Sequence, residues 1–413
     1  AYLERWLPAA GGLLQEPMFA GAAARAEQAR TYSPGSLRPE TARALYGAEL
    51  HFSSSRIDVL AGCRFAHFLQ YGLRAQEREP AEFDSRFYGT FVHDVLEHVV
   101  QQTEREGGFA AVPRSRVQEL AQERMEQNAQ TLLETFPDSG RTGYLLRRTF
   151  DEVTQVVDEL YDELSVSAFR PKFCELEFSA RGALPGVAFA GERCRGVVEG
   201  FVDRVDVWQS GGRPYVRVVD YKTGKKSFDY TNVLHGRGLQ MLLYLFALVR
   251  QGGHLLHGEP LPAGVLYFPA RIERVSVRDR LAQAEIEKER RKQLRRSGVL
   301  LNSDPVLEAM EPCGGSPRFL PYTLDKEGRK TGDLASFAQL AQLERFVFQT
   351  VAALGDELAD GRIDPDPCIR DAKDSACAFC PYSEVCAGHE QPRWLKKITA
   401  EEFWQTLERR EHG

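Results

Sequence analysis

Four cysteines constrain the fold of this chain most, because three lie close together near the end of the sequence and the fourth lies far upstream. Cys377, Cys380 and Cys386 form a C-x2-C-x5-C pattern, and Cys63 precedes them by most of the chain. This spacing is too tight for a disulfide framework in a chain of 413 residues. It suits thiolates that converge on a metal ion or an iron–sulfur cluster. A shared metal would tie the two ends of one domain together.

Composition limits the cellular compartment and the kinds of partner that we expect. Eight cysteines without a recognisable signal peptide indicate a reducing cytoplasm, with liganded or free thiols. The longest apolar stretch, Met241–Val249, is shorter than the roughly 18 residues of a membrane span. The net charge of −6 and the pI near 6.0 give no global attraction to nucleic acid. Any contact with DNA must therefore come from local basic patches.

The pattern of elements predicts an α/β protein. Residues 1–50 form an N-terminal segment with no visible chemistry, which we interpret as a lead into the fold or as the remnant of an upstream region. Residues 51–395 form the main domain, with a helical insertion at about 275–312, and residues 396–413 form a helical tail. The main domain is large enough to bury its own core.

Helices come first along this domain. The serines at 53–55 include a candidate N-cap for a helix, and Cys63 lies in this helix or just after it. Apolar residues repeat every four positions from residue 86 to residue 102, which predicts an amphipathic helix, and Gly89, His93 and Glu97 form a stripe beside the apolar face. Two further helices are expected at 114–135 and 143–165.

Strands follow the helices. The expected strands are 173–178, 196–208, 215–222 and 264–270, with a turn at 210–214 and a helix at 239–250 before the last strand. Side chains alternate between the faces of a strand, so Asp220 and Lys222 point to the same side. Asp203, on the neighbouring strand, can join them.

These side chains suit phosphodiester chemistry. Asp203 and Asp220 offer the hard oxygen ligands that Mg²⁺ prefers, and Lys222 can stabilise developing negative charge. His93 could add a metal ligand, and Glu175 or its neighbour Glu177 could complete the set. An isolated Asp-x-Lys is usually a solvated strand end, and a lone helical histidine is usually structural. The prediction depends on the whole constellation.

The ordered motifs resemble the RecB-type branch of the PD-(D/E)XK nucleases, and in particular the nuclease region of the B subunits of AddAB-type helicase–nucleases. The likeness covers about residues 45–392. The motifs are the following: Gly89-x-x-x-His93, Gly200-Phe-Val-Asp203-Arg-Val-Asp206, Asp220-Tyr-Lys222-Thr-Gly224 and Gln240-x-x-x-Tyr244, with the cysteines enclosing them. Val202 stands where the family name has proline, and Arg64 stands where proline usually follows the first cysteine. Neither departure removes a ligand.

The resemblance implies a restriction-endonuclease-like core, a central mixed sheet flanked by helices, with an iron–sulfur staple joining its N- and C-terminal parts. It implies residue roles as well. Metal ligands would be His93, Asp203, Asp220 and, less closely matched, Glu175; Lys222 would be the catalytic lysine; Gln240 and Tyr244 would support the site and contact DNA; and Cys63, Cys377, Cys380 and Cys386 would hold a 4Fe–4S cluster. Zinc satisfies four thiolates equally well, and Cys368 is a rival fourth ligand.

The resemblance also implies a function and partners. We expect a Mg²⁺- or Mn²⁺-dependent exonuclease that cuts single-stranded DNA emerging from a broken duplex end, together with an AddA-type helicase–nuclease subunit and without a membrane. The chain has no P-loop, since Thr223–Ser227 lacks the first glycine. The alternatives are a non-catalytic DNA-end-binding module and a self-standing RecB-family nuclease. The basic run from Lys288 to Arg296 is either a solvated helix face or a phosphate contact.

Overall fold

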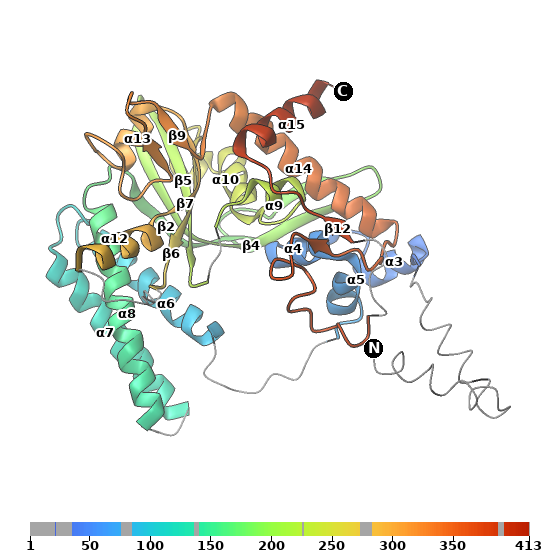
Figure 1. Cartoon of the computed structure of the whole chain (residues 1–413), viewed down its shortest axis with the longest axis horizontal. Helices are drawn as coiled ribbons and strands as arrows, with labels where there is room; N and C mark the ends of the chain where they lie inside the picture. Colours follow the sequence, from blue (N-terminus) through green and yellow to red (C-terminus); the bar gives the residue numbers. More distant parts are fainter. Residues whose placement is uncertain are drawn as a thin grey trace.

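The computed structural model describes residue 21 and residues 35–75, 85–135, 140–224, 227–272, 283–386 and 392–412. A mixed β-sheet forms the centre of this part of the chain (Figure 1). Its strands follow the order β1-β4-β5-β6-β7-β10, and β2 and β3 also pair with β4. The strands are β1 Leu50–Ser53, β2 Arg170–Phe178, β3 Val187–Ala190, β4 Arg195–Ser210, β5 Arg213–Lys222, β6 Leu261–Pro269, β7 Ser297–Leu301 and β10 Leu334–Ala335.

The long strand β4 organises this sheet. Its first half pairs with β1 and β3, and its second half pairs antiparallel with β2 and β5. The meander β2-β4-β5 predicted from the sequence is confirmed, as is the turn after Ser210. Strand β6 then runs parallel to β5, which requires the crossover helix between them. The predicted α/β class with a central mixed sheet and flanking helices is confirmed.

Helices cover the sheet on both sides (Figure 1). Helix α10 (Gln240–Gln251) packs against β5 and β6, and every residue from Met241 to Leu248 is buried, as expected for a helix that is apolar all round. Helix α6 packs against β2, and α7 and α8 continue that layer. The longest helices are α6 Ser85–Arg105, α7 Arg114–Thr135, α8 Gly140–Leu164, α14 Phe337–Ala359 and α15 Ala400–His412, and the shorter helices α3 Pro39–Tyr46 and α4 Ser54–Gly62 precede them in the chain.

Shorter elements complete the described chain. They are α5 Arg64–His67, a π-helical turn at Phe68–Gly72, α9 Tyr230–Leu234, α11 Gly253–Leu256, α12 Gln283–Leu294, α13 Asp304–Met310, and the small strands β8 Tyr322–Leu324, β9 Lys330–Gly332, β11 Cys368–Ile369 and β12 Arg393–Trp394. The predicted serine cap is confirmed, because the Ser53 side chain accepts a hydrogen bond from the Arg56 N–H at the start of α4. No helix in the described part of the chain is long and apolar enough to cross a membrane.

One expectation about local structure was wrong, and several short strands were missed. The insertion at 275–312 is not wholly helical, because β7 lies between α12 and α13 and pairs antiparallel with β6. The strands β1 and β3 were missed, since four-residue strands carry little periodic signal. The last helix packs firmly into the fold, because Phe403, Trp404 and Leu407 of α15 are buried, and Phe403 packs against Tyr230 and Phe346.

Candidate active site

Two neighbouring strands bring the predicted catalytic residues together. Residue Arg204 of β4 lies opposite Val219 of β5, so the antiparallel register carries Asp203 to the level of Asp220. The backbone N–H of Tyr221 donates a hydrogen bond of 2.7 Å to Asp203 Oδ2. Lys222 Nζ forms an ion pair with Asp220 Oδ2. The trio predicted from the sequence therefore occupies one place in the fold.

Helix α6 contributes His93 from the flank of the sheet. Its Nε2 lies 2.8 Å from the carbonyl oxygen of Tyr221, and its Nδ1 lies 3.6 Å from Asp203 Oδ2. A carbonyl can only accept, so Nε2 carries the proton and Nδ1 keeps its lone pair on the Asp203 side. This tautomer leaves Nδ1 able to bind a metal ion, in the way that a second hydrogen bond commonly orients a histidine ligand.

Strand β2 contributes Glu175 through an irregular backbone. Its neighbours Cys174 and Leu176 pair with Arg204 and Val202 of β4, whereas Glu175 has a φ of +47°, in the left-handed region. A glutamate in this conformation is strained, and such strain is common at functional sites. Donor atoms of His93, Glu175 and Asp203 all lie within 4.8 Å of one another. The alternative ligand Glu177 is instead hydrogen-bonded to the Ser179 hydroxyl.

The electrostatics of this cluster fit a cation. Burial, and then the neighbouring Asp220, raise the pKa of Asp203 to about 7, against the opposing effect of His93. Burial, and then Glu97, also raise the pKa of Glu175. Carboxylates that are crowded and partly desolvated resist ionisation, and a divalent cation relieves that cost. Carboxylate oxygens with one imidazole nitrogen are a donor set suited to Mg²⁺ or Mn²⁺. Asp220 lies beside the three-residue group and is held by Lys222.

Helix α10 supports β4 from the other side through Tyr244. Its ring stacks on Phe178 with centroids 5.0 Å apart, and burial raises its pKa to about 12 against the effects of Ser54 and Gln240. A Cβ atom on Gly200 would lie 2.0 Å from the Tyr244 hydroxyl, and Gly200 has a φ of +156°. The glycine that begins the Gly-x-x-Asp motif is therefore required by the tyrosine that ends the Gln-x-x-x-Tyr motif.

Comparison with known proteins agrees with this geometry. The PD-(D/E)XK nuclease superfamily matches residues 51–387, which is most of the chain. The chain belongs to this superfamily. Membership of this superfamily accounts for both the motifs predicted to be catalytic and the fold around them.

The chain is also similar to part of longer proteins. The B subunit of an ATP-dependent helicase/deoxyribonuclease from Moorella thermoacetica is 34% identical over 357 residues, which cover 85% of this chain and 31% of the relative. The corresponding protein from Thermoanaerobacter sp. is 30% identical over 379 residues, covering 88% of this chain and 33% of the relative. The chain thus spans about a third of the length of these relatives, and the resemblance inferred from its motifs is confirmed.

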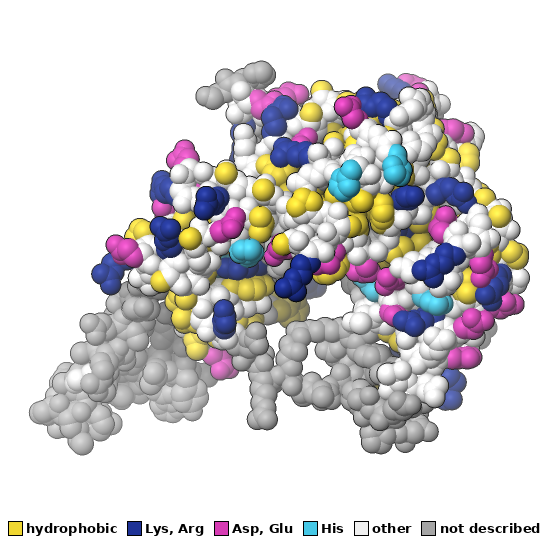
Figure 2. All heavy atoms as spheres, turned by 180° about the vertical axis from the view of Figure 1, so that it is seen from behind, with side chains coloured by type: hydrophobic (Ala, Val, Ile, Leu, Met, Phe, Trp, Pro, Cys, Tyr) yellow, Lys and Arg dark blue, Asp and Glu magenta, His cyan; other side chains and the backbone are white. Residues whose placement is uncertain are grey.

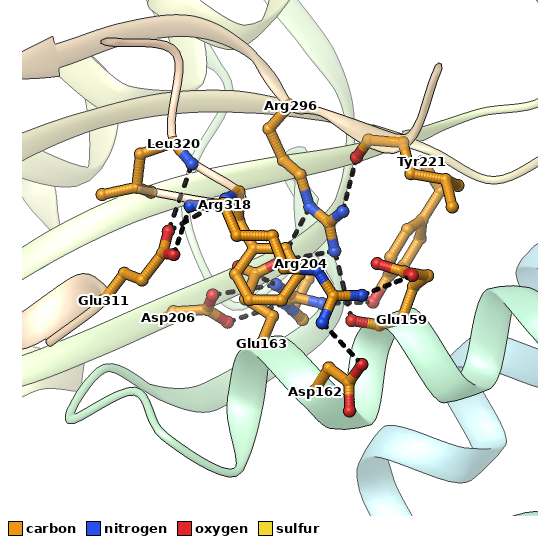
Figure 3. Close-up of polar contacts among 12 residues, drawn as sticks. Glu159, Asp162, Glu163, Arg204, Asp206, Tyr221, Arg296, Glu311, Arg318 and Leu320 are labelled. Atoms are coloured by element: carbon orange, nitrogen blue, oxygen red, sulfur yellow. Dashed lines mark hydrogen bonds and ion pairs between the residues drawn. The ribbon is translucent and has the colours of Figure 1, made fainter. Parts of the chain in front are cut away.

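Behind β4 and β5 lies a buried charge network that the sequence did not predict (Figure 3). Arg204 binds both oxygens of Asp206 at 2.8 and 3.0 Å, and it donates a 2.8 Å hydrogen bond to the Tyr221 hydroxyl. Arg217 and Arg296 share Glu163 of α8 at 3.0 and 2.9 Å. Each of these five charged side chains is at most 2% exposed.

Tyr221 connects this network to the residues predicted to be catalytic. The Tyr221 side chain is held by Arg204, while its N–H and carbonyl hold Asp203 and His93. Alternation along β5 therefore separates two functions, with Asp220 and Lys222 on one face and Tyr221 with the guanidinium groups on the other. The sequence signal for this buried network is a charged residue inside a strand. Such residues are common in the sequence, so the signal could not single out the network.

The same contacts correct the interpretation of the basic run at its last two residues only. Arg296 is a buried partner of Glu163, and Arg295 donates to the carbonyl groups of Leu320 and Tyr322, so neither is a free cation on a helix face. Arg291 is exposed. Figure 2 shows acidic and basic side chains interspersed over one face of the nuclease without a broad patch of one sign.

The four predicted cysteine ligands lie around one small cavity. Cys63, Cys377, Cys380 and Cys386 line a space of about 230 Å³, although Cys63 is far from the others in sequence. Burial raises the pKa of Cys63 to about 11, and N–H groups of Ala66 and Phe65 oppose this rise. Cys368 does not line this cavity, and its thiol donates to the carbonyl group of Ala61 instead. Cys174, Cys194 and Cys313 lie elsewhere, and none of the eight cysteines forms a disulfide in the described chain.

Direct contacts also join the two cysteine-bearing segments. Arg64, which replaces the usual proline, donates to Asp366 at 2.9 Å and to Glu357 at 2.9 Å. Arg393 donates to the Ala61 carbonyl at 2.6 Å. The Tyr382 hydroxyl donates to the Ala75 carbonyl at 2.7 Å. At position 64, an arginine held by ion pairs therefore stands where proline is usual, at the junction of the two cysteine-bearing segments.

Proposed function

We propose that this chain is a divalent-metal-dependent deoxyribonuclease that hydrolyses phosphodiester bonds of single-stranded DNA at broken duplex ends. The observation that carries this proposal is the cluster of His93, Glu175 and Asp203 donor atoms beside the Asp220–Lys222 ion pair. Membership of the PD-(D/E)XK superfamily supports it, as does the similarity to subunits named as helicase/deoxyribonucleases. The word subunit in these names suggests a partner chain. The motif resemblance suggests that this partner is an AddA-type helicase–nuclease subunit and that the two serve double-strand break repair.

Each residue then has a role. His93 Nδ1, Glu175, Asp203 and Asp220 would hold Mg²⁺ or Mn²⁺, which when bound withdraws charge from the phosphate and makes water more acidic. Lys222 stabilises negative charge on the phosphate oxygens and positions water near Asp220. Gln240 and Tyr244 keep β4 and α10 in register, so that Asp203 faces Asp220.

Cleavage of end-labelled single-stranded DNA with Mg²⁺ or Mn²⁺ tests this proposal. We expect the wild-type chain to give products, and Lys222→Ala and Asp220→Ala to lower the rate by at least about 100-fold without a change in circular dichroism. The matched control is Lys172→Ala, which removes an exposed strand lysine that is not one of the proposed site residues. Equal products from the wild type and Lys222→Ala would overturn the assignment and favour a non-catalytic DNA-end-binding module.

We also propose that the four cysteines hold a 4Fe–4S cluster that staples the ends of the domain. The shared cavity supports this idea. Four thiolates would also satisfy zinc, and the motif resemblance is what favours the cluster.

Metal analysis of chain purified without oxygen tests the staple. We expect iron and sulfide with visible absorbance in the wild type, and their loss in Cys380→Ala, together with faster proteolysis and weaker DNA binding. Cys313→Ala is the control, because Cys313 lies outside the cavity. Stoichiometric zinc without iron would contradict the cluster, and unchanged protease resistance in Cys380→Ala would contradict the staple.

A further inference from the structure

A second hollow lies next to the cysteine site and has no assigned role. It encloses about 520 Å³, a size typical of small-molecule sites. Its walls come from α4, from the segment after Lys222, and from the cysteine-bearing segment. The residues that matter below are Asn232, Arg237, Tyr267 and Phe379.

This hollow connects with the catalytic lysine. Ser227 and Tyr267 line it, and both also line a smaller space of about 300 Å³ whose wall includes Lys222, Arg271 and Arg295. The Tyr267 ring lies 5.8 Å from Lys222 Nζ. A chain molecule that occupied both spaces would thus pass directly by the catalytic lysine.

Polar atoms in the hollow are left without partners. Asn232 Oδ1 and Arg237 Nη1 are buried atoms that make no hydrogen bond within the described residues. The nearest acidic contact of Arg237 Nη1 is a long one, 3.9 Å from Asp374. Buried polar atoms without partners are costly, and a bound ligand is one way to satisfy them.

Acidic residues in the same walls are already committed. Asp58 accepts a 2.7 Å hydrogen bond from the Gly238 N–H. Asp229 caps α9 and forms a 2.9 Å ion pair with Arg370. Arg237 is therefore the charged side chain of these walls that can bind a ligand, and its positive charge favours an anion.

An exposed aromatic ring completes the hollow. Phe379 lies between two cysteines of the C-x2-C-x5-C segment and is 96% exposed, yet it lines the hollow. Exposing a phenylalanine ring is unfavourable, and its flat face is a surface on which a nucleic acid base can stack. A guanidinium group, an amide and an aromatic ring together match the phosphate, base edge and base face of one nucleotide.

We propose that this hollow binds one nucleotide of the DNA single strand, outside the bond that is cut, with its base on Phe379, its phosphate on Arg237 and its base edge on Asn232. This proposal rests on the proposed nuclease function for the identity of the strand. The pocket would hold the strand between the cysteine site and Lys222. It would therefore set where along the strand cleavage falls.

Binding of a labelled oligonucleotide without divalent metal tests the pocket independently of cleavage. We expect Phe379→Ala to raise the Kd roughly tenfold, because base–aromatic stacking has about that effect, and Phe379→Trp to restore it. Arg237→Gln should weaken binding and reduce the salt dependence by about one phosphate contact. Val385→Ala is the matched control, since Val385 is 69% exposed on the same segment but does not line the hollow.

Cleavage of strands with one abasic nucleotide at successive positions locates the pocket. With Mg²⁺, the wild type should lose rate at one distance from the cut bond, and Phe379→Ala should be insensitive to that abasic position. An identical abasic profile in both proteins, or an equal loss of binding in Val385→Ala, would overturn the proposal. A wild-type chain that binds no oligonucleotide also overturns it, whereas one that binds without cutting overturns only the nuclease assignment.

Discussion

The buried Glu163 gives a sharp prediction about stability. Its carboxylate lies between Arg217 and Arg296 and is 2% exposed. Burial alone would raise the pKa of Glu163, but Arg296, Arg217 and Arg204 outweigh it and lower the pKa from 4.5 to about 2. That difference corresponds to about 3 kcal/mol of folding free energy. Glu163→Gln keeps the shape but leaves three buried guanidinium groups with one carboxylate, Asp206.

We expect Glu163→Gln to lower the free energy of unfolding at pH 7 by about 3 to 5 kcal/mol. The sign of the pH dependence follows from the lowered pKa. The stabilisation is fully present above pH 4.5 and is lost as the pH falls from about 4.5 to 2, so the gap between the variant and the wild type should narrow by roughly 1.4 kcal/mol for each pH unit below 4.5.

Urea denaturation at pH 7, 5, 4 and 3.5 measures this gap. The matched control is Glu159→Gln, one turn earlier on α8, because Glu159 pairs with Arg318, which is 40% exposed. A half-exposed pair should contribute at most about 1 kcal/mol. Equal losses in the two variants would refute the reasoning, and so would a Glu163→Gln deficit that does not change with pH.

Two further predictions follow from local packing and charge. Gly200→Ala should destabilise the protein by about 1 to 3 kcal/mol, because its Cβ would lie 2.0 Å from the Tyr244 hydroxyl, and Tyr244→Phe in the same chain should recover part of the loss in thermal denaturation. Burial, and then Arg56, lower the pKa of His67 to about 3, so stability should fall by roughly 2 kcal/mol as the pH drops from 6.5 to 5. His67→Gln should remove that slope and His254→Gln should keep it; an unchanged slope in His67→Gln would contradict the assignment.

Periodic patterns predicted the fold well where the elements were long. The helix at 114–135 coincides with α7, and the three-strand meander was correct, because amphipathic repeats of sufficient length specify their own secondary structure. The strands β1 and β3 were too short to show a period. Strand β7 was missed because its five residues directly follow a charged stretch and are too few to show a period. Pairing with β6 stabilises them as a strand.

The prediction of the candidate site was correct where it depended on short motifs, and it left one ligand undecided. Asp203, Asp220 and Lys222 occur in short motifs on adjacent strands, so their meeting follows from strand alternation and a hairpin. Glu175 could not be separated from Glu177 by alternation, since both lie on the same face of a regular strand. In the structure Glu175 has a left-handed backbone, and its donor atoms lie near those of His93 and Asp203.

Local patterns were enough to specify the α/β class, the order of the motifs and the types of side chain available to bind metal, because these depend on periodicity and on covalent neighbours. Most contacts between elements distant in sequence became clear only from the folded chain. Folding drew Cys63 to the distant cysteines, turned His93 Nδ1 toward Asp203, and buried Arg296 against Glu163 instead of leaving it on a basic helix. The physical reason is that each of these contacts joins elements distant in sequence, and their energies depend on burial, which no local pattern specifies.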